Sequence, residues 1–502
     1  MEMESINPRT GFCQQTKTFH SLRPPTPFPP PHQPLSITHF VLSLLQSSTV
    51  PTTTTTYLNI PSTGQSLTYS QAIDHIHSLS SSLKNHYSLN NKDVAFILCP
   101  PSLHVPVLYL SLMHLGVTIS PANPLSSDSE LTHQIQLCKP KIAFATSQTA
   151  HKLPSLPLGT ILIDSPEFTS LLTRPKPQAS QPRVEVSQSD VAAILYSSGT
   201  TGRVKGVGLT HRNLIALISG LHHNRQEPDP NQPEQPPVSL FILPLFHVFG
   251  FFMSINAFSR GETLVLMERF DFVQMLKYVE KYRVTYMPVS PPLIVALVKS
   301  DLTEKYDLSS LRSLGCGGAP LGKEVADKFK EKFPHVEIAQ VIPFMEAKIV
   351  DPETGEGLGP GQRGELWLRG PTVMKGSDHV HHCIHMFLNL VGKNSSILFL
   401  RLYLTFWPNC IFFNFYIFKL ICFWCFFIVL IMLLSHHMFD YFQVPPAELE
   451  KLLQSNHEIA DAAVIPMRHL TITLMFIVYE PVAYCFSFWI ISSRQESHVY
   501  KT

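Results

Sequence analysis

The chain has 502 residues, long enough for more than one domain and for a substantial hydrophobic core. Its 38 Lys and Arg nearly balance its 37 Asp and Glu, which argues against nucleic acid or an anionic membrane surface as a partner. Nine cysteines follow no disulfide-framework spacing, and the N-terminus lacks the layout of a secretory signal. We therefore expect a small-molecule partner, a reducing compartment and no disulfides.

Predicted elements alternate along most of the chain. Residues 1–35 are rich in proline and predict a flexible or polyproline-like lead. From Ser36 to Gly376, helical and strand-like stretches alternate, which predicts an α/β domain with a mainly parallel sheet at 36–376. The predicted helices are Tyr69–Leu83, His104–Leu115, Asp271–Lys281 and Pro292–Lys299, and the predicted strands are Asp93–Cys99, Lys141–Ala145, Thr160–Ile163, Ser239–Leu243, Glu262–Leu266 and Val284–Met287.

The character of the chain changes after Gly376. Residues 410–434 contain no Gly, Pro, Asp or Glu and carry one charge, so they are apolar enough to span a bilayer. Twelve of the 33 Phe fall between Phe387 and Phe442, a bias typical of translated non-coding sequence. We interpret 377–442 as an aberrant apolar insert and 467–502 as an unrelated tail, with an enzyme-like fragment at 443–466 between them. The alternative for 410–434 is a real transmembrane helix.

A glycine-rich string follows the predicted strand Val191–Tyr196 and precedes a predicted helix that begins near Thr210. Its glycines allow a tight turn with N–H groups aimed at one point, while hydroxyls and one lysine add donors for phosphate oxygens. The spacing is not that of a Walker loop, and an ordinary loop is the alternative. The order strand, loop, helix predicts a phosphate-binding loop. The predicted phosphate-binding residues are Ser197, Ser198, Gly199, Thr200, Thr201, Gly202 and Lys205.

This string resembles the phosphate-loop motif of the adenylate-forming superfamily, which includes acyl-CoA synthetases and firefly luciferase. The stretch from Leu243 to Gly250 is similar to the second core motif of that superfamily, and the stretch from Gly315 to Leu321 to the turn that lines its acyl and adenine pockets. The stretch from Val444 to Glu450 is close to the form found in plant 4-coumarate:CoA ligases. The resemblance implies a large α/β N-terminal adenylate-forming domain, truncated here, with a fragment of the small α+β C-terminal lid domain.

The resemblance also implies a reaction and its participants. A carboxylate would attack ATP to give an acyl-AMP, and the CoA thiol would then displace AMP; the partners would be a carboxylic acid, ATP and CoA, with Mg²⁺ as cofactor and no nucleic acid. His247 would be catalytic, beside the acyl carboxylate. Phe249 stands where 4-coumarate:CoA ligases often carry Tyr, which favours a less polar acyl group. The implied substrate and adenylate residues are Phe249, Gly317, Gly318, Ala319 and Gln340, and the implied CoA-binding residue is Arg269.

Several parts of the resembled family are missing. Gln340 runs directly into Val341, where the family continues with a Gly-Tyr-Gly-Leu-Thr-Glu type motif whose Glu holds Mg²⁺, so no metal ligand is predicted here. The Thr-Gly-Asp motif and the Pro-Lys-x-x-x-Gly-Lys motif are also absent. We therefore expect negligible ligase activity from a chain of this sequence. The alternatives are a fatty acyl or jasmonate-precursor CoA ligase and a membrane-associated pseudoenzyme.

Localisation is expected to follow the family, in the cytoplasm or the peroxisome. Many relatives in the resembled family end in a Ser-Lys-Leu type tripeptide, which is a peroxisomal address. This chain ends in Tyr500-Lys501-Thr502, which is not such a signal. A membrane location is expected only if 410–434 forms a real transmembrane helix.

Overall fold

A computed structural model describes residues 6–22, 25–174, 184–197, 204–223, 237–319, 321–340, 346–362, 364–374, 386–388, 459–466 and 473–479. The described residues fall into two compact units. The first unit holds every described residue up to 388, and the second holds residues 459–466 and 473–479.

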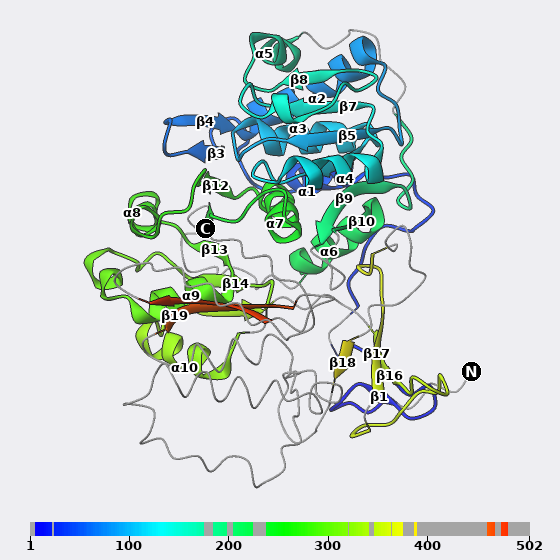
Figure 1. Cartoon of the computed structure of the whole chain (residues 1–502), viewed down its shortest axis with the longest axis vertical. Coiled ribbons are helices and arrows are strands. Elements are labelled where there is room, and N and C mark those ends of the chain that lie inside the picture. Colours follow the sequence, from blue (N-terminus) through cyan, green and yellow to red (C-terminus); the bar gives the residue numbers. More distant parts are fainter. Residues whose placement is uncertain are drawn as a thin grey trace, which may run out of the picture. The chain divides into compact units, whose positions relative to one another are not determined.

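The first sheet of the first unit has six strands in the order β10-β9-β6-β5-β7-β8 (Figure 1). Its neighbours pair in parallel except β10, which runs antiparallel to β9. Parallel neighbours need crossover connections, and most of the connections between these strands contain a helix. The strands are β5 (Val94–Leu98), β6 (Thr118–Pro121), β7 (Ile142–Ala145), β8 (Thr160–Leu162), β9 (Val191–Ser197) and β10 (Lys205–Thr210), and the helices are α2 (Tyr69–Tyr87), α3 (His104–His114), α4 (Asp128–Cys138) and α5 (Pro166–Thr173), with a 3₁₀ turn at Ala150–Lys152.

The second sheet has seven strands in the order β15-β14-β13-β11-β12-β3-β4. All of its neighbours pair in parallel except the hairpin of β3 and β4. The strands are β3 (Thr56–Ile60), β4 (Gln65–Thr68), β11 (Val238–Phe241), β12 (Thr263–Leu266), β13 (Tyr286–Val289), β14 (Ser313–Cys316) and β15 (Glu337–Gln340). The remaining helices are α1 (Ile37–Gln46), α6 (His211–His223), α7 (Val248–Ser259), α8 (Phe272–Tyr282), α9 (Pro291–Lys299) and α10 (Lys323–Lys332), with a 3₁₀ turn at Asp301–Lys305.

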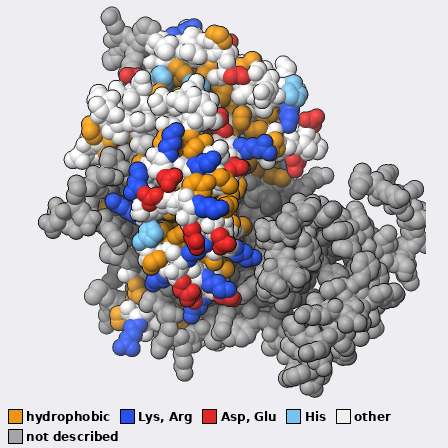
Figure 2. Space-filling view, turned by 90° about the vertical axis from the view of Figure 1, so that its left-hand side faces the viewer, with side chains coloured by type: hydrophobic (Ala, Val, Ile, Leu, Met, Phe, Trp, Pro, Cys, Tyr) orange, Lys and Arg blue, Asp and Glu red, His pale blue; other side chains and the backbone are white. Residues whose placement is uncertain are grey.

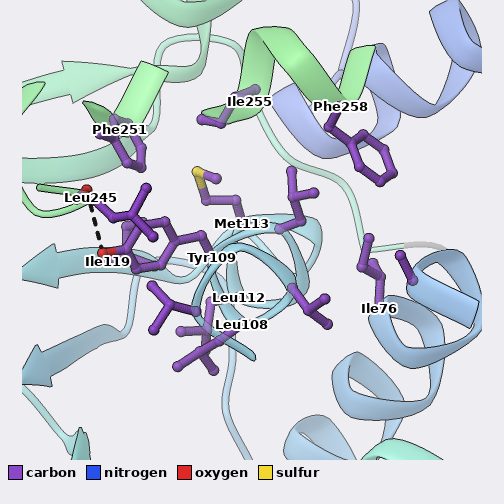
Figure 3. Close-up of a cluster of buried hydrophobic side chains, with 14 of the residues drawn as sticks. Ile76, Leu108, Tyr109, Leu112, Met113, Ile119, Leu245, Phe251, Ile255 and Phe258 are labelled. Atoms are coloured by element: carbon purple, nitrogen blue, oxygen red, sulfur yellow. Dashed lines mark hydrogen bonds between the residues drawn. The ribbon is translucent and has the colours of Figure 1, made fainter. Parts of the chain in front are cut away.

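Helix α3 lies at the centre of the core. Between its terminal histidines it carries no charged residue, and Val105 through Met113 are all buried, as expected for a helix that other elements cover on every side. Figure 3 shows its side chains facing those of α7, with Tyr109 near Phe251. The Tyr109 hydroxyl donates to the carbonyl of Leu245 at 3.5 Å. Helix α3 therefore contacts the loop that leads into α7.

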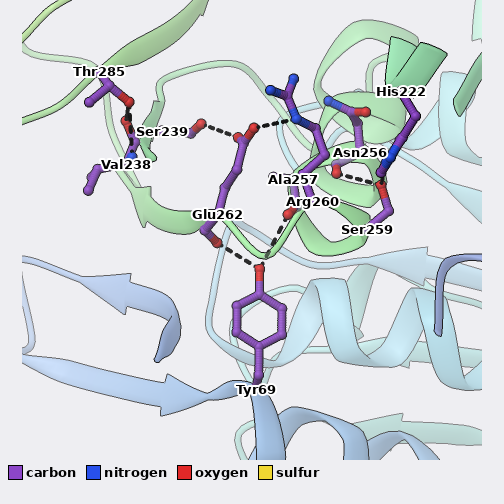
Figure 4. Close-up of polar contacts among 10 residues, drawn as sticks. All are labelled: Tyr69, His222, Val238, Ser239, Asn256, Ala257, Ser259, Arg260, Glu262 and Thr285. Carbon is purple, nitrogen blue, oxygen red and sulfur yellow. Dashed lines mark hydrogen bonds and ion pairs between the residues drawn. The ribbon is translucent and has the colours of Figure 1, made fainter. Parts of the chain in front are cut away.

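A buried polar network joins the amino ends of β11 and β12 to α2 (Figure 4). The carboxylate of Glu262, 3% exposed, accepts from the Ser239 hydroxyl at 2.5 Å and pairs with the Arg260 guanidinium at 3.0 Å. The Tyr69 hydroxyl donates to the Glu262 carbonyl at 2.8 Å. A buried carboxylate is stable only with such partners. We interpret this network as structural, because it lies at the edge of the sheet where the strands begin.

The described surface mixes charges of both signs. Helix α10 buries Phe329 and exposes acidic and basic side chains, with Lys328 and Glu324 paired at 3.0 Å. The face drawn in Figure 2 likewise intersperses basic and acidic side chains. This distribution agrees with the balanced composition.

A third sheet includes two short strands from residues 1–35. The prediction of a flexible lead was therefore wrong for this part of the chain. Its order is β1-β2-β16-β17-β18, and β2 pairs antiparallel with β16. Phe12 and Cys13 are buried, so these apolar side chains gain from packing that the proline content alone did not suggest. The strands are β1 (Phe12–Cys13), β2 (Thr18–Phe19), β16 (Glu346–Val350), β17 (Gly364–Arg369) and β18 (Met386–Leu388).

The proline-rich stretch itself is also anchored. The Gln188 side-chain amide donates to the carbonyls of Pro30 at 2.7 Å and Gln33 at 3.0 Å. The Arg212 guanidinium donates to the Pro29 carbonyl and lies 4.3 Å from the centre of the Phe28 ring. Proline lacks an N–H but keeps its carbonyl, so such a stretch is held by donors from elsewhere in the fold.

The predicted order strand, loop, helix was wrong in one element. Strand β10 stands between the loop and α6, paired antiparallel with β9. Its sequence alternates glycine with Val207 and Leu209, so the glycines concealed a strand pattern. The other predicted helices and strands lie within a few residues of observed ones.

Most residues after 374 lie outside the described ranges, including the apolar stretch 410–434. Strand β18 falls within the predicted insert and pairs with β17. In the second unit, β19 (Ile459–Pro466) pairs antiparallel with β20 (Thr473–Tyr479), so a fragment predicted as enzyme-like forms a hairpin with part of the predicted tail. Among the described residues, no helix has the length and apolar character that a membrane crossing requires.

Candidate functional site

The carboxyl ends of the parallel strands β11 to β15 lie along one edge of the second sheet. Strand β11 is followed in the chain by its neighbour β12 on one side, and β13 by its neighbour β14 on the other. The strand order therefore reverses between β11 and β13, and ligands of open α/β sheets bind at such a reversal. Sequence-predicted residues follow three of these strands: His247 and Phe249 come after β11, Arg269 after β12, and the turn Gly317–Ala319 after β14.

Phe249 and Gly317 are in direct contact. A Cβ atom added to Gly317 would lie 3.1 Å from the Phe249 ring, closer than an ordinary side-chain contact. The Gly317 N–H donates to the Val289 carbonyl at 3.1 Å, which ties the turn after β14 to the end of β13. Phe249 is 8% exposed. The ring of Phe249 thus packs on Gly317, and a side chain at this position would require the ring to shift.

The rest of the glycine turn presents bare backbone. Gly318 has a φ of +88°, a conformation that glycine adopts without strain, and no atom lies within 4 Å of a Cβ added there. Gly318 and Ala319 are exposed. Gln340 pairs in register with Cys316, so the end of β15 lies beside this turn. Such a surface suits the close approach of a flat ligand.

His247 forms the N-cap of α7. Its Nδ1 accepts from the Phe249 N–H at 3.4 Å, and its own N–H donates to the Pro244 carbonyl at 3.2 Å. The side chain is exposed. With Nδ1 accepting, the neutral ring carries its proton on Nε2. The helix start therefore fixes the orientation of the imidazole while leaving the ring accessible.

The predicted phosphate loop is described only at its ends. Ser197 ends β9 and Lys205 begins β10, and the two are partners in the antiparallel register. Ser197 is exposed and Lys205 is half-buried. Ser198, Gly199, Thr200, Thr201 and Gly202 lie outside the described residues. The two described ends are held side by side, as a tight loop between them requires.

Arg269 is exposed in the segment between β12 and α8. No described interaction joins it to His247, Phe249 or Gly317. Among the described residues, no three His, Cys, Asp or Glu side chains converge to hold a metal ion.

Two features of the site were missed in the sequence. Gly250 lies so close to Pro244 that a Cβ would meet the Pro244 carbonyl oxygen at 2.3 Å. The available signal was the glycine that ends the core motif from Leu243 to Gly250. Cys316, next to Gly317, is buried, and burial raises the pKa of its thiol to about 11. That thiol stays protonated near neutral pH and is not a nucleophile there.

Comparisons with known proteins show which family the chain resembles. The family described as AMP-binding enzyme matches residues 47–341 and 336–377. The 4-coumarate--CoA ligase-like 9 of Arabidopsis thaliana is 48% identical, covering 95% of this chain and 88% of its own. The 4-coumarate--CoA ligase-like 5 of Oryza sativa subsp. japonica is 40% identical, covering 92% and 84%. The Peroxisomal OPC-8:0-CoA ligase 1 of Arabidopsis thaliana is 33% identical, covering 92% and 87%.

Solved structures share the fold of the first unit. A red-emitting luciferase from Phrixothrix hirtus has a TM-score of 0.60 at 24% identity, covering 70% of this chain and 72% of its own. The N-terminal domain of FACL13 from Mycobacterium tuberculosis has a TM-score of 0.58 at 17% identity, covering 69% and 92%. The predicted α/β adenylate-forming N-terminal domain is thereby confirmed as a fold. From the sequence relatives, the chain belongs to the AMP-binding enzyme family, within its plant 4-coumarate-CoA ligase-like branch.

Proposed function

We propose that this chain is an ATP-binding member of the AMP-forming carboxylate-CoA ligases and that it lacks the groups needed for turnover. The observation that carries the proposal is the Phe249 ring closed over Gly317, beside His247, at the reversal of strand order. An apolar ring, a bare glycine turn and an oriented imidazole together suit an acyl adenylate. The glycine-rich string between β9 and β10 adds the donors that a triphosphate needs.

In the complete family reaction, a carboxylate oxygen attacks the α-phosphorus of ATP, and the bond to pyrophosphate breaks. The CoA sulfur then attacks the acyl carbon, and AMP leaves. We assign Lys205 and the loop hydroxyls to the phosphates, His247 to the carboxylate, and Gly317, Gly318, Ala319 and Gln340 to the adenylate, with Arg269 facing the phosphates of CoA. Mg²⁺ would enter with the nucleotide, and no step is assigned to it.

Loss of turnover is supported by the break at Gln340. The match to the AMP-binding enzyme family splits into two segments that overlap at residues 336–341, where the sequence lacks the Thr and Glu motif. The ribose-binding Thr-Gly-Asp motif and the lid lysine motif are also absent. Each preorganised contact of this kind is worth about 3–4 kcal/mol of barrier. The N-terminal domain thus lacks part of its nucleotide-binding and metal-binding sequence after Gln340. We also propose that the C-terminal lid domain is present only in part.

Titration calorimetry of the full chain tests this proposal. MgATP is expected to bind, whereas incubation with ATP, CoA and a panel of carboxylic acids is expected to yield no thioester. Lys205→Met is expected to weaken ATP binding about tenfold or more, because a charged partner of the phosphates is lost. Lys323→Met, at an exposed lysine on α10, is the matched control. Thioester formation by the wild-type chain would overturn the proposed loss of turnover, and absence of ATP binding would overturn the function itself.

The acyl group is proposed to be apolar rather than phenolic. Phe249 offers a ring without a hydroxyl where the acyl group meets the Gly317 turn, so a phenolic hydroxyl would find no partner in that ring. Nonhydrolysable acyl-sulfamoyl adenosines provide the probes. Cinnamoyl and octanoyl forms are expected to bind more tightly than the 4-coumaroyl form, and Phe249→Tyr is expected to improve the 4-coumaroyl form selectively. Preference for the octanoyl form would favour a fatty acyl or jasmonate-precursor ligase ancestry.

Localisation is also a proposal. One relative is named as peroxisomal, and the family expectation for this chain is the cytoplasm or the peroxisome. The apolar stretch 410–434, on which a membrane-associated pseudoenzyme would depend, lies outside the described residues.

A further inference from the structure

Helix α4 is fixed firmly on the first sheet. Its N-terminus carries a capping box, in which Ser127 accepts from the Glu130 N–H at 3.4 Å and Glu130 accepts from the Ser127 N–H at 3.0 Å. On its sheet-facing side, Leu131 and Cys138 pack with Phe96 and other buried side chains of the sheet. Both ends of the helix are therefore held, and groups on it can serve as a rigid reference.

One stem of the predicted phosphate loop is bonded to this helix. Tyr196, which immediately precedes Ser197 on β9, donates its hydroxyl to the backbone carbonyl of Gln134 at 3.3 Å. The same hydroxyl lies 2.6 Å from the hydroxyl of Ser120, at the end of β6. Burial raises the pKa of Tyr196, so the phenol remains a donor at any physiological pH.

The other stem is bonded to the preceding residue of the same helix. The Nε2 atom of His133 lies 3.0 Å from the carbonyl oxygen of Val204, and a carbonyl only accepts, so Nε2 carries the hydrogen. Val204 directly precedes Lys205. The two stems also touch: Gly206 opposes Tyr196 in the register, and a Cβ added to Gly206 would lie 3.2 Å from Ile194 and 3.8 Å from the Tyr196 ring.

We propose that helix α4 positions the two described ends of the predicted phosphate loop, Ser197 and Lys205, by holding the entering strand through Tyr196 and the leaving strand through His133. His133 and Gln134, two consecutive residues of one helix, thus fix where the backbone leaves the sheet and where it rejoins it. They thereby also fix the position of Lys205, the first residue of β10. Both are positioning contacts, since neither is assigned to the nucleotide. The inference rests on the proposed function, because it requires that the loop between Ser197 and Lys205 bind ATP.

The test uses the full chain and four variants, three of them on helix α4. His133→Ala removes the donor to Val204, whereas His133→Gln offers an amide donor in a similar place. Gln136→Ala, at an exposed position of the same helix, is the control. Calorimetric titration with MgATP is expected to show affinity lowered about threefold to tenfold by His133→Ala, which is the typical effect of one hydrogen bond. His133→Gln is expected to recover most of the affinity, and Gln136→Ala to leave it unchanged.

Thermal unfolding without nucleotide separates positioning from general stability. If His133→Ala lowers the melting temperature but leaves the ATP affinity of the folded chain unchanged, the contact is only structural and the inference is overturned. Tyr196→Phe keeps the ring over Gly206 and removes the hydroxyl, and it is expected to weaken ATP binding in the same way. Absence of ATP binding by the wild-type chain overturns the proposed function as well, so the two failures are distinguishable.

Discussion

Alanine at position 250 is expected to destabilise the chain by about 3 kcal/mol, a large effect for one added methyl group. The new Cβ would lie 2.3 Å from the carbonyl oxygen of Pro244 and 2.9 Å from its carbonyl carbon. Backbone atoms cannot swing aside as a flexible side chain can, so the loop and the first turn of α7 must separate. The Pro244 carbonyl also accepts from the His247 N–H, so the shift reaches His247.

Urea unfolding of the wild-type and Gly250→Ala chains measures the difference in the free energy of unfolding. Gly322→Ala is the matched control, because a Cβ at Gly322 has no atom within 4 Å and its φ is −63°, which alanine adopts easily. The control is expected to change stability by less than about 1 kcal/mol. Equal stability of Gly250→Ala and wild type would show that the loop before α7 relaxes freely, contrary to the packing described.

Lowering the pH from 6.5 to 4 is expected to cost about 3 kcal/mol of stability through His211 alone. The ring is fully buried at the start of α6, and its Nδ1 accepts from the N–H of Ile37 at 3.1 Å. Burial lowers the pKa of His211 from 6.5 to about 4, with a smaller opposing effect from Asp190 and a smaller lowering from His39.

The sign follows from proton uptake. Between pH 6.5 and about 4 the unfolded chain binds a proton at this histidine and the folded chain does not, so acid favours unfolding across that window. The stability is fully present above pH 6.5 and has been lost at about pH 4. Burial also lowers the pKa values of His75 and His104, so these residues likewise make the free energy of unfolding decrease as the pH falls.

His211→Asn isolates the contribution of His211. The asparagine carbonyl can still accept from the Ile37 N–H, but the side chain does not titrate. Urea unfolding at pH 7, 5.5 and 4.5 is expected to show a flatter dependence for the variant than for wild type, with the difference largest at the lowest pH. An identical pH dependence in both chains would mean that His211 becomes protonated in the folded state without penalty.

Local patterns predicted the core of the fold better than its periphery. Strands such as β5 and β7 were predicted because buried parallel strands are continuous apolar runs. Strands β1 and β2 have two residues each, and β2 depends on β16, which is distant in the chain. No local periodicity encodes such a partner. Strand β10 was missed because its glycines resembled a turn.

The candidate site shows the same division. His247 and the glycine turn were predicted from their motifs, while the contact between Phe249 and Gly317 depends on β11, β13 and β14 being neighbours in the sheet. The contacts of Tyr196 and His133 with the loop stems require α4 to lie beside β9 and β10, which the order of elements in the chain does not specify. Tertiary neighbours of this kind are set by the whole sheet.

The two large sheets are interleaved along the chain, and this has a consequence for biosynthesis. The hairpin of β3 and β4 is made before any strand of the first sheet, yet β3 pairs with β12, which is made after the first sheet is complete. During translation, the edge of β3 that β12 will cover therefore waits unpaired while the first sheet forms. Unpaired strand edges promote association between chains, and distant pairings slow folding. A nascent chain that stops before Thr263 would retain this exposed edge, so completion of β12 is the step that removes a site of aggregation.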